Sequence, residues 1–242
     1  MDPKDRLIFA LDVPDRVRAL RLVNLLREEV GLFKVGLELF MAEGPQFLKE
    51  MAETLPGGYF LDLKFHDIPA TLAGASRAAF QGAKFLTVHC DQGVKLLKAT
   101  AAALGEKVKL LGVTVLTSLG PEDLLALGYD PRYARDPVQL VLLKAGIAQA
   151  AGLAGVVCSG REAAAVKEKY GKDFLVVCPG IRPAWAEVEG DDQNRAATAY
   201  DAIKNGADYL VVGRPIRQSP DPISAARRVV EEIAQAMDER GD

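Results

Sequence analysis

Residues 59–71 read YFLDLKFHDIPAT, and this stretch joins the end of an apolar run to a dense group of charges. Residues two apart on an extended strand point to the same face, so Asp62 and Lys64 are predicted to project side by side. Asp67 adds a second carboxylate just beyond them. Buried charges are costly unless they are paired, so the grouping favours an electrostatic site at the end of a strand. The alternative is an ion pair on a solvated edge strand, which contributes little.

The composition is that of an ordinary globular protein. Its 242 residues are 49% hydrophobic and 26% charged, enough for a large core, and the net charge of -3 argues against a general nucleic-acid binder. No apolar stretch approaches the roughly 20 residues of a membrane span, and the charged start MDPKDRLIFALD is unlike a signal peptide. Cys90, Cys158 and Cys178 form no CxxC pair, which indicates reduced thiols and a cytoplasmic location. The two histidines, His66 and His89, are too few for a multi-histidine metal site.

Short apolar runs alternate with longer amphipathic segments along the whole chain. The runs are rich in Val, Leu, Ile and Phe and lack a regular alternation of apolar and polar residues. That pattern is typical of strands buried on both faces of a parallel sheet. The predicted strands are Leu7–Leu11, Leu32–Val35, Tyr59–Leu63, Phe85–His89, Leu110–Leu116, Gly155–Cys158, Phe174–Cys178 and Tyr209–Val212.

The segments between these runs carry helix start and stop signals. Ser159 and Glu162 have the spacing of a capping box before Ala163–Tyr170, and Gly171 is suited to end that helix. Proline is favoured in a first helical turn and glycine just past a last one. These signals predict a helix at Thr71–Gln81, with Pro69 before it and Gly82 after it, and two further helices that begin at Pro45 and Pro121. Helices are also predicted at Ala196–Asn205 and Ile223–Met237.

Eight strand–helix units in about 240 residues predict an α/β fold, a (β/α)₈ TIM barrel, with residues 1–242 as a single domain. The competing architecture is an open, doubly wound sheet. That fold would be favoured by a GxGxxG turn after the first strand, which continues here as Asp12-Val-Pro-Asp15. The chain also lacks a GxxxxGK[ST] phosphate loop. The barrel is therefore the better prediction.

In such barrels the active site lies at the carboxyl ends of the strands. Lys34 lies near the end of the second apolar run and, with Asp62, Lys64 and Asp67, could complete an alternating Lys–Asp–Lys–Asp array. Opposite charges restrain one another in such an array and tune proton transfer. Alternatively, Lys34 is a surface lysine whose stem lies along apolar residues. The strand ends in order are Asp12, Lys34, Asp62 with Lys64, His89, Thr117, Ser159, Pro179–Arg182 and Gly213–Arg214.

The loops after the last two predicted strands indicate a phosphate site. They read PGIRP at 179–183 and GRPI at 213–216, and barrels frequently bind phosphate with these loops. Glycine allows close approach of the backbone and arginine offers a fork of donors. Alternatively, Gly213 only turns the chain and Arg214 caps a helix or forms a surface pair. The following AWAEVEGDDQN could be a lid with Gln193 as a neutral donor, or a solvated loop.

Taken together, these motifs resemble the orotidine 5′-phosphate decarboxylase family, in order and along essentially the whole chain. The core DxKxxD pattern is shared with a wider group of enzymes, whereas the full DLKFHDIPAT segment is far more specific. The matching motifs are ALD at 10–12, FKVG at 33–36, DLKFHDIPAT at 62–71, VTVLTS at 113–118, PGIRP at 179–183 and GRPI at 213–216.

The resemblance implies conversion of orotidine 5′-phosphate to UMP and CO₂, the last step of de novo UMP synthesis, without a metal or organic cofactor. It implies a cytoplasmic homodimer. In that family Lys64 would protonate C6, Asp62 would lie beside the substrate carboxylate, and Lys34 would belong to the same array. Asp67 would reach the neighbouring subunit's site together with Ile68 and Thr71. The other implied contacts are Asp12 and Thr71 to ribose, Thr117 to the pyrimidine, and Arg182, Gln193, Gly213 and Arg214 to phosphate.

Two other functions are compatible with parts of the pattern. A relative such as 3-keto-L-gulonate 6-phosphate decarboxylase uses magnesium, and is expected to carry a carboxylate where this chain has Lys34. A cation at that position opposes metal binding. A catalytically silent phosphate-binding barrel is the more distant alternative, but a binding module would not need a proton donor next to two carboxylates.

Overall fold

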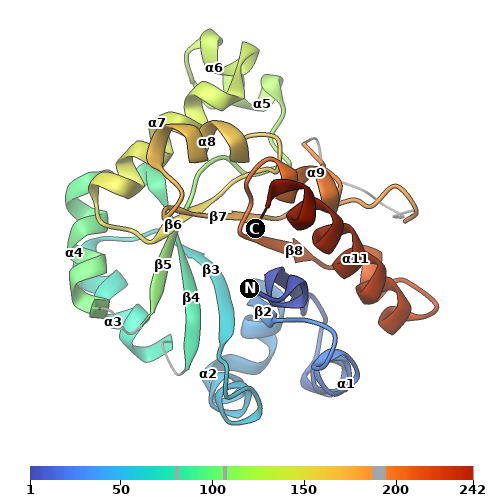
Figure 1. Ribbon diagram of the computed structural model, residues 1–242. Coiled ribbons are helices and arrows are strands. Elements are labelled where there is room, and N and C mark those ends of the chain that lie inside the picture. The colour runs from blue at the N-terminus through green and yellow to red at the C-terminus, as the bar shows by residue number, and fades with distance from the viewer. Residues whose placement is uncertain (80–81, 106–107, 187–194, 242) are drawn as a thin grey trace.

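The computed structural model describes residues 1–79, 82–105, 108–186 and 195–241, and its strands close into a barrel (Figure 1). Each strand from β1 to β8 pairs in parallel with the next. The barrel closes where β1 pairs with β8, with Leu7 opposite Leu210. The predicted (β/α)₈ fold is therefore confirmed.

The strands lie close to the predicted runs and differ from them by up to three residues at their ends. β3 extends two residues further than predicted, and β5 ends three residues earlier. β5 ends early because the side chains of Lys144 and Arg195, from two other parts of the chain, donate hydrogen bonds to the carbonyls of residues 114–116. These carbonyls therefore do not continue the sheet. The strands are β1 Leu7–Ala10, β2 Leu32–Gly36, β3 Tyr59–Phe65, β4 Ala83–His89, β5 Lys109–Val113, β6 Gly155–Val157, β7 Leu175–Cys178 and β8 Tyr209–Val212.

Helices surround the barrel on its outside (Figure 1). Short 3₁₀ turns precede β1 at Pro3–Arg6 and follow β4 at Cys90–Gln92. The helices are α1 Arg16–Leu26, α2 Leu37–Thr54, α3 Pro69–Ala79, α4 Val94–Leu104, α5 Pro121–Ala126, α6 Pro131–Arg135, α7 Pro137–Ala150, α8 Ala163–Tyr170, α9 Ala199–Lys204, α10 Arg214–Arg217 and α11 Pro222–Arg240. The predicted end of the third helix, Gln81, lies outside the described residues.

The helix signals were mostly correct. α8 occupies the predicted span, and the Glu162 carboxylate accepts the backbone N–H of Ser159, which is one half of the predicted capping box. The Ser159 hydroxyl accepts the backbone N–H of Arg161 and not that of Glu162. Pro45 follows a kink at Gly44, whose φ of 67° lies in the left-handed region, so it starts the second part of α2. α9 begins at Ala199 rather than at residue 196, because Thr198 caps it and Ala197 instead bridges to Ile181 beyond β7.

Two apolar layers hold the barrel together. The larger layer lies between the sheet and the helices and contains, for example, Phe9, Phe33 and Met51. The smaller one fills the barrel interior, where the ring of Phe85 meets those of Phe60 and Tyr209 edge-on. Because the interior is filled, only the mouth is left for a ligand. In the described part of the chain, every helix is too short or too polar to cross a bilayer.

Candidate active site

A cavity of about 420 Å³ opens at the carboxyl end of the barrel. Its floor consists of apolar side chains that point inward from the strands, including Ala10, Phe60 and Val211. Its wall carries most of the predicted site residues, contributed by strand ends far apart in the sequence. The polar and glycine lining residues are Asp12, Lys34, Asp62, Lys64, Thr117, Gly180, Arg182, Gly213, Arg214 and Arg217.

Two lysines and two carboxylates form a continuous array on one side of the cavity. Lys34 Nζ lies 2.9 Å from Asp12 Oδ1 and 3.6 Å from Asp62 Oδ2. Lys64 Nζ lies 2.9 Å from the same oxygen of Asp62. Lys34 is only 7% exposed, so the alternative prediction that it is a surface lysine is wrong. Asp62 is therefore held between two ammonium groups.

Gly36 leaves room for this array. A Cβ at that position would lie 2.9 Å from Lys34 Nζ and 3.0 Å from Asp12 Oδ1. A Cβ there would make the Lys34 ammonium shift and would crowd the Asp12 carboxylate. The glycine of the FKVG motif is thus explained by the close approach of these side chains to the backbone.

The backbone of Lys64 departs from the regular strand on which the sequence argument relied. Its φ of 49° is in the left-handed region, and the pairing of β3 with β4 is irregular between Leu61 and Phe65. Such a conformation costs a non-glycine residue roughly 1–2 kcal/mol and is concentrated at functional sites. Asp62 and Lys64 do meet, as predicted, although the backbone at Lys64 is not that of a regular extended strand.

Thr87 of β4 holds this turn in place. Its hydroxyl donates to Asp62 Oδ1 at 2.9 Å and accepts the backbone N–H of Lys64 at 2.9 Å. The residue is completely buried. Thr87 was not among the predicted site residues, although a threonine within the apolar run of β4 is a usable signal, since a buried hydroxyl needs partners.

The array keeps its charges because each group stabilises its neighbours. Burial works against the charged form of Lys34, but Asp62 and Asp12 outweigh it, so the pKa of Lys34 is raised. Burial likewise opposes ionisation of Asp62, yet Lys34 and Lys64 outweigh it and lower its pKa. Lys34 and Asp62 are therefore charged at neutral pH.

The lowered pKa of Asp62 predicts a specific acid dependence of stability. A carboxyl group with a lower pKa in the folded state stabilises the fold above its unfolded value, about 3.9, and this contribution is lost as pH falls through the folded value. In denaturant titrations at a series of pH values, wild type should lose more unfolding free energy on acidification than Asp62→Asn. Equal slopes for wild type and Asp62→Asn would contradict the assignment.

The other side of the cavity is cationic. The backbone of Gly180, with a φ of 72°, takes a conformation that favours glycine, and Arg182 follows it in the loop after β7. Gly213 and Arg214 enter from the loop after β8. Arg217, at the end of α10, lines the same cavity and was missed, although it directly follows the GRPI motif. Arginines converging on a cavity suit a phosphate.

Four predicted site residues are not part of this cavity as described. Asp67, Ile68 and Thr71 are exposed, and none is among the described residues that line it. The Asp67 carboxylate accepts the backbone N–H of Ile68 at 2.6 Å. Gln193 lies outside the described residues, between 186 and 195. Thr117, in contrast, does line the cavity.

The described residues contain no group of three or more histidine, cysteine, aspartate or glutamate side chains placed to hold a metal ion.

The fold and the cavity define a (β/α)₈ barrel with a lysine–carboxylate array and arginine-bearing loops at its mouth. Residues 5–229 match the model of the "Orotidine 5'-phosphate decarboxylase / HUMPS family", and the chain belongs to that family.

Individual relatives agree with this membership. The chain is 46% identical over 237 residues to the orotidine 5′-phosphate decarboxylase of Desulfosudis oleivorans, covering 97% of this chain and 95% of that protein. It is 47% identical over 230 residues to the protein of the same name from Anaeromyxobacter sp. strain K, covering 95% and 98%. The crystal structure of orotidine 5′-phosphate decarboxylase from Lactobacillus acidophilus superposes with a TM-score of 0.77 at 33% identity, covering 94% of this chain and 98% of that one.

Proposed function

We propose that this protein decarboxylates orotidine 5′-phosphate to UMP and CO₂, the last step of de novo UMP synthesis, without a metal or organic cofactor. The observation that carries the proposal is the Asp62–Lys64 pair, 2.9 Å apart in a cavity that arginines line on its other side. Its volume of about 420 Å³ is within the usual range for small-molecule sites. Relatives named orotidine 5′-phosphate decarboxylase match nearly the whole chain.

The chemistry requires a cation next to the reacting carbon. Breaking the bond between C6 and the carboxylate leaves its electron pair on C6 and releases CO₂. The Lys64 ammonium stabilises this charge and then transfers a proton to C6, which gives UMP and a neutral amine that regains a proton from water. Asp62 keeps the ammonium in place and, next to the substrate carboxylate, repels it in the ground state.

The remaining residues would bind the parts of the substrate that do not react. Lys34 fixes Asp62 and Asp12, and Asp12 would bind ribose hydroxyls. Thr117 would contact the pyrimidine. The phosphate would lie between the loops after β7 and β8. The groups proposed to bind it are Arg182, Gln193, Gly213 and Arg214, with Arg217 as an addition suggested by the cavity. Phosphate binding energy would serve to organise the reacting end.

The site would be completed by a second subunit. We propose a homodimer in which Asp67, Ile68 and Thr71 reach the partner's cavity, Thr71 to bind ribose. Their exposure at the carboxyl end of β3 supports this, since they do not line the cavity of their own barrel. Residues 1–242 would form one catalytic domain, located in the cytoplasm.

A direct assay tests the proposal. Purified protein, treated with EDTA, should convert orotidine 5′-phosphate to UMP, followed by the change in ultraviolet absorbance. The ammonium of Lys34 beside Asp62 opposes a magnesium site there, so magnesium should not raise the rate. Failure to turn over the substrate would contradict the proposed function, and strict dependence on magnesium would favour a metal-dependent sugar-phosphate relative.

A further inference from the structure

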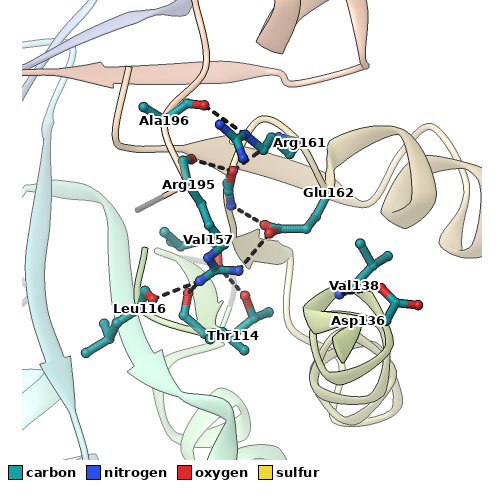
Figure 2. Close-up of polar contacts among 11 residues, drawn as sticks. Thr114, Leu116, Asp136, Val138, Val157, Arg161, Glu162, Arg195 and Ala196 are labelled. Carbon is teal, nitrogen blue, oxygen red and sulfur yellow. Dashed lines mark hydrogen bonds and ion pairs between the residues drawn. The ribbon is translucent and has the colours of Figure 1, made fainter. Parts of the chain in front are cut away.

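Arg195 is a nearly buried arginine that the proposed chemistry does not use. It is 9% exposed and follows directly on the part of the chain that is not described. Figure 2 shows its side chain reaching away from its own segment toward Leu116 and Glu162. Arg195 Nη1 donates to Glu162 Oε1 at 2.7 Å, and Nη2 donates to the carbonyls of Val115 and Leu116 at 2.9 and 2.8 Å.

These contacts reach the wall of the active-site cavity. Val115 and Leu116 follow β5, line the cavity and immediately precede Thr117, the proposed pyrimidine contact. Glu162 follows β6 and also accepts the backbone N–H of Ser159 at 2.7 Å. One guanidinium thus joins the chain after β5 to the chain after β6 (Figure 2).

The backbone carbonyls of residues 195–197 accept hydrogen bonds from the chain after β6 and from the chain after β7. Ser159 Oγ donates to the Arg195 carbonyl at 2.8 Å, and Arg161 Nε donates to the Ala196 carbonyl at 3.0 Å. The backbone N–H of Arg182 donates to the Ala197 carbonyl at 2.8 Å. Arg182 lines the arginine side of the cavity. Residues 195–197 therefore connect that side with the segment that carries Thr117.

We propose that Arg195 is a positioning residue that couples the pyrimidine side of the cavity, at Thr117, to the phosphate side, at Arg182. The inference rests on the proposed function, because it assumes that these two residues bind parts of one substrate. Arginine is required since its planar fork serves a carboxylate and two carbonyls at once, which an ammonium group cannot do in the same geometry. Burial raises the pKa of Glu162, and the positive charge of Arg195 acts against that rise. Removing either side chain would therefore leave the other charge buried without its partner.

A double-mutant cycle tests the coupling. Steady-state kinetics with orotidine 5′-phosphate would be measured for Arg195→Lys, Thr117→Ala and the double variant. Arg195→Lys should lower kcat/KM about 10- to 100-fold, in the range seen when a positioning contact is lost. If Arg195 acts through Thr117, the loss in the double variant should be at least about fivefold smaller than the product of the two single losses. A purely structural role would lower the melting temperature without producing this coupling.

The controls make each outcome decisive. Arg227 forms a similar ion pair with Glu29 on the outside of the barrel, at 2.7 and 2.9 Å, so Arg227→Lys should behave as wild type. If Arg195→Lys does not fold, Glu162→Gln takes its place in the cycle, because it weakens the ion pair that holds the Arg195 guanidinium. Losses that simply multiply, or wild-type kinetics for Arg195→Lys, would overturn the inference. A wild-type protein without turnover would instead overturn the proposed function itself.

Discussion

Replacing Lys64 with alanine is expected to lower kcat/KM for orotidine 5′-phosphate by about 10⁴-fold or more. Loss of a general acid costs about 10²–10⁴-fold, and loss of a charge that stabilises the transition state costs about 10²–10³-fold. Lys64 would supply both, because its ammonium lies in the cavity and is held 2.9 Å from Asp62.

The variant should remain folded. Without Lys64, the Asp62 carboxylate would still contact Lys34 Nζ at 3.6 Å and the Thr87 hydroxyl at 2.9 Å, so its charge would not be left unpaired. Alanine at position 64 meets the same backbone strain as lysine, since both are L-residues at a φ of 49°. Calorimetry should still detect binding of UMP, which would locate the defect in the chemical step.

Lys204→Ala is the matched control. Lys204 also pairs with a carboxylate, Glu239 at 2.6 Å, but on the outer helices α9 and α11. That variant should have wild-type kinetics. A Lys64→Ala protein that folds, binds UMP and retains wild-type turnover would refute the proposed role of Lys64.

The second large effect is expected for Asp67→Ala, with a loss of about 10²-fold or more in kcat/KM, comparable to removal of one electrostatic contact in a transition state. In its own subunit the Asp67 carboxylate is exposed and accepts only a local N–H, from Ile68, among the contacts described. Its removal should therefore leave the melting temperature of the barrel nearly unchanged. Loss of activity without loss of stability would point to a role in the partner's site.

Mixing experiments separate a shared site from a contact within one subunit. In a mixed dimer of Lys64→Ala and Asp67→Ala subunits, one cavity would combine an intact Lys64 with the partner's intact Asp67. With random exchange at equal concentrations, half of the dimers are mixed and each has one intact site, so about a quarter of the wild-type activity should return.

The control mixture is Lys64→Ala with Asp62→Asn. Both residues meet in the cavity of one barrel, at 2.9 Å, so no mixed dimer would contain an intact site and no activity should return. Subunit exchange would be verified with differently tagged chains. Absence of recovery with Asp67→Ala despite exchange would place Asp67 in the site of its own subunit.

Much of the fold and part of the site could be predicted from local patterns. Strands buried on both faces of a parallel sheet need continuous apolar runs, so each run was visible without knowledge of its neighbours. Helix starts such as Pro121 and stops such as Gly171 depend on backbone groups a few residues away, which the sequence also contains. The loops with Arg182 and Arg214 were found because barrel topology places the ends of β7 and β8 beside each other.

The errors arose where contacts between distant segments override local pattern. β5 ends early because Lys144 and Arg195, from two other parts of the chain, bind the carbonyls that would have continued it. α9 starts late because Ala197 bridges to the chain after β7. Thr87 and Arg217 were overlooked because their local signals, a threonine in an apolar run and an arginine after GRPI, do not name the partner, and only the fold shows that they meet Asp62 and the cavity.

The sequence by itself determined the order of strands and helices, the barrel, and the motif that joins Asp62 to Lys64, since these depend on burial patterns and on neighbours along the chain. Only the tertiary structure decided how that motif is held. The left-handed turn at Lys64 is stabilised by Thr87 from β4, and Lys34 from β2 meets Asp62 across the strand pairing. Charges a strand apart interact strongly only when folding brings them within a few ångströms and removes water, and that distance is not written in any local pattern.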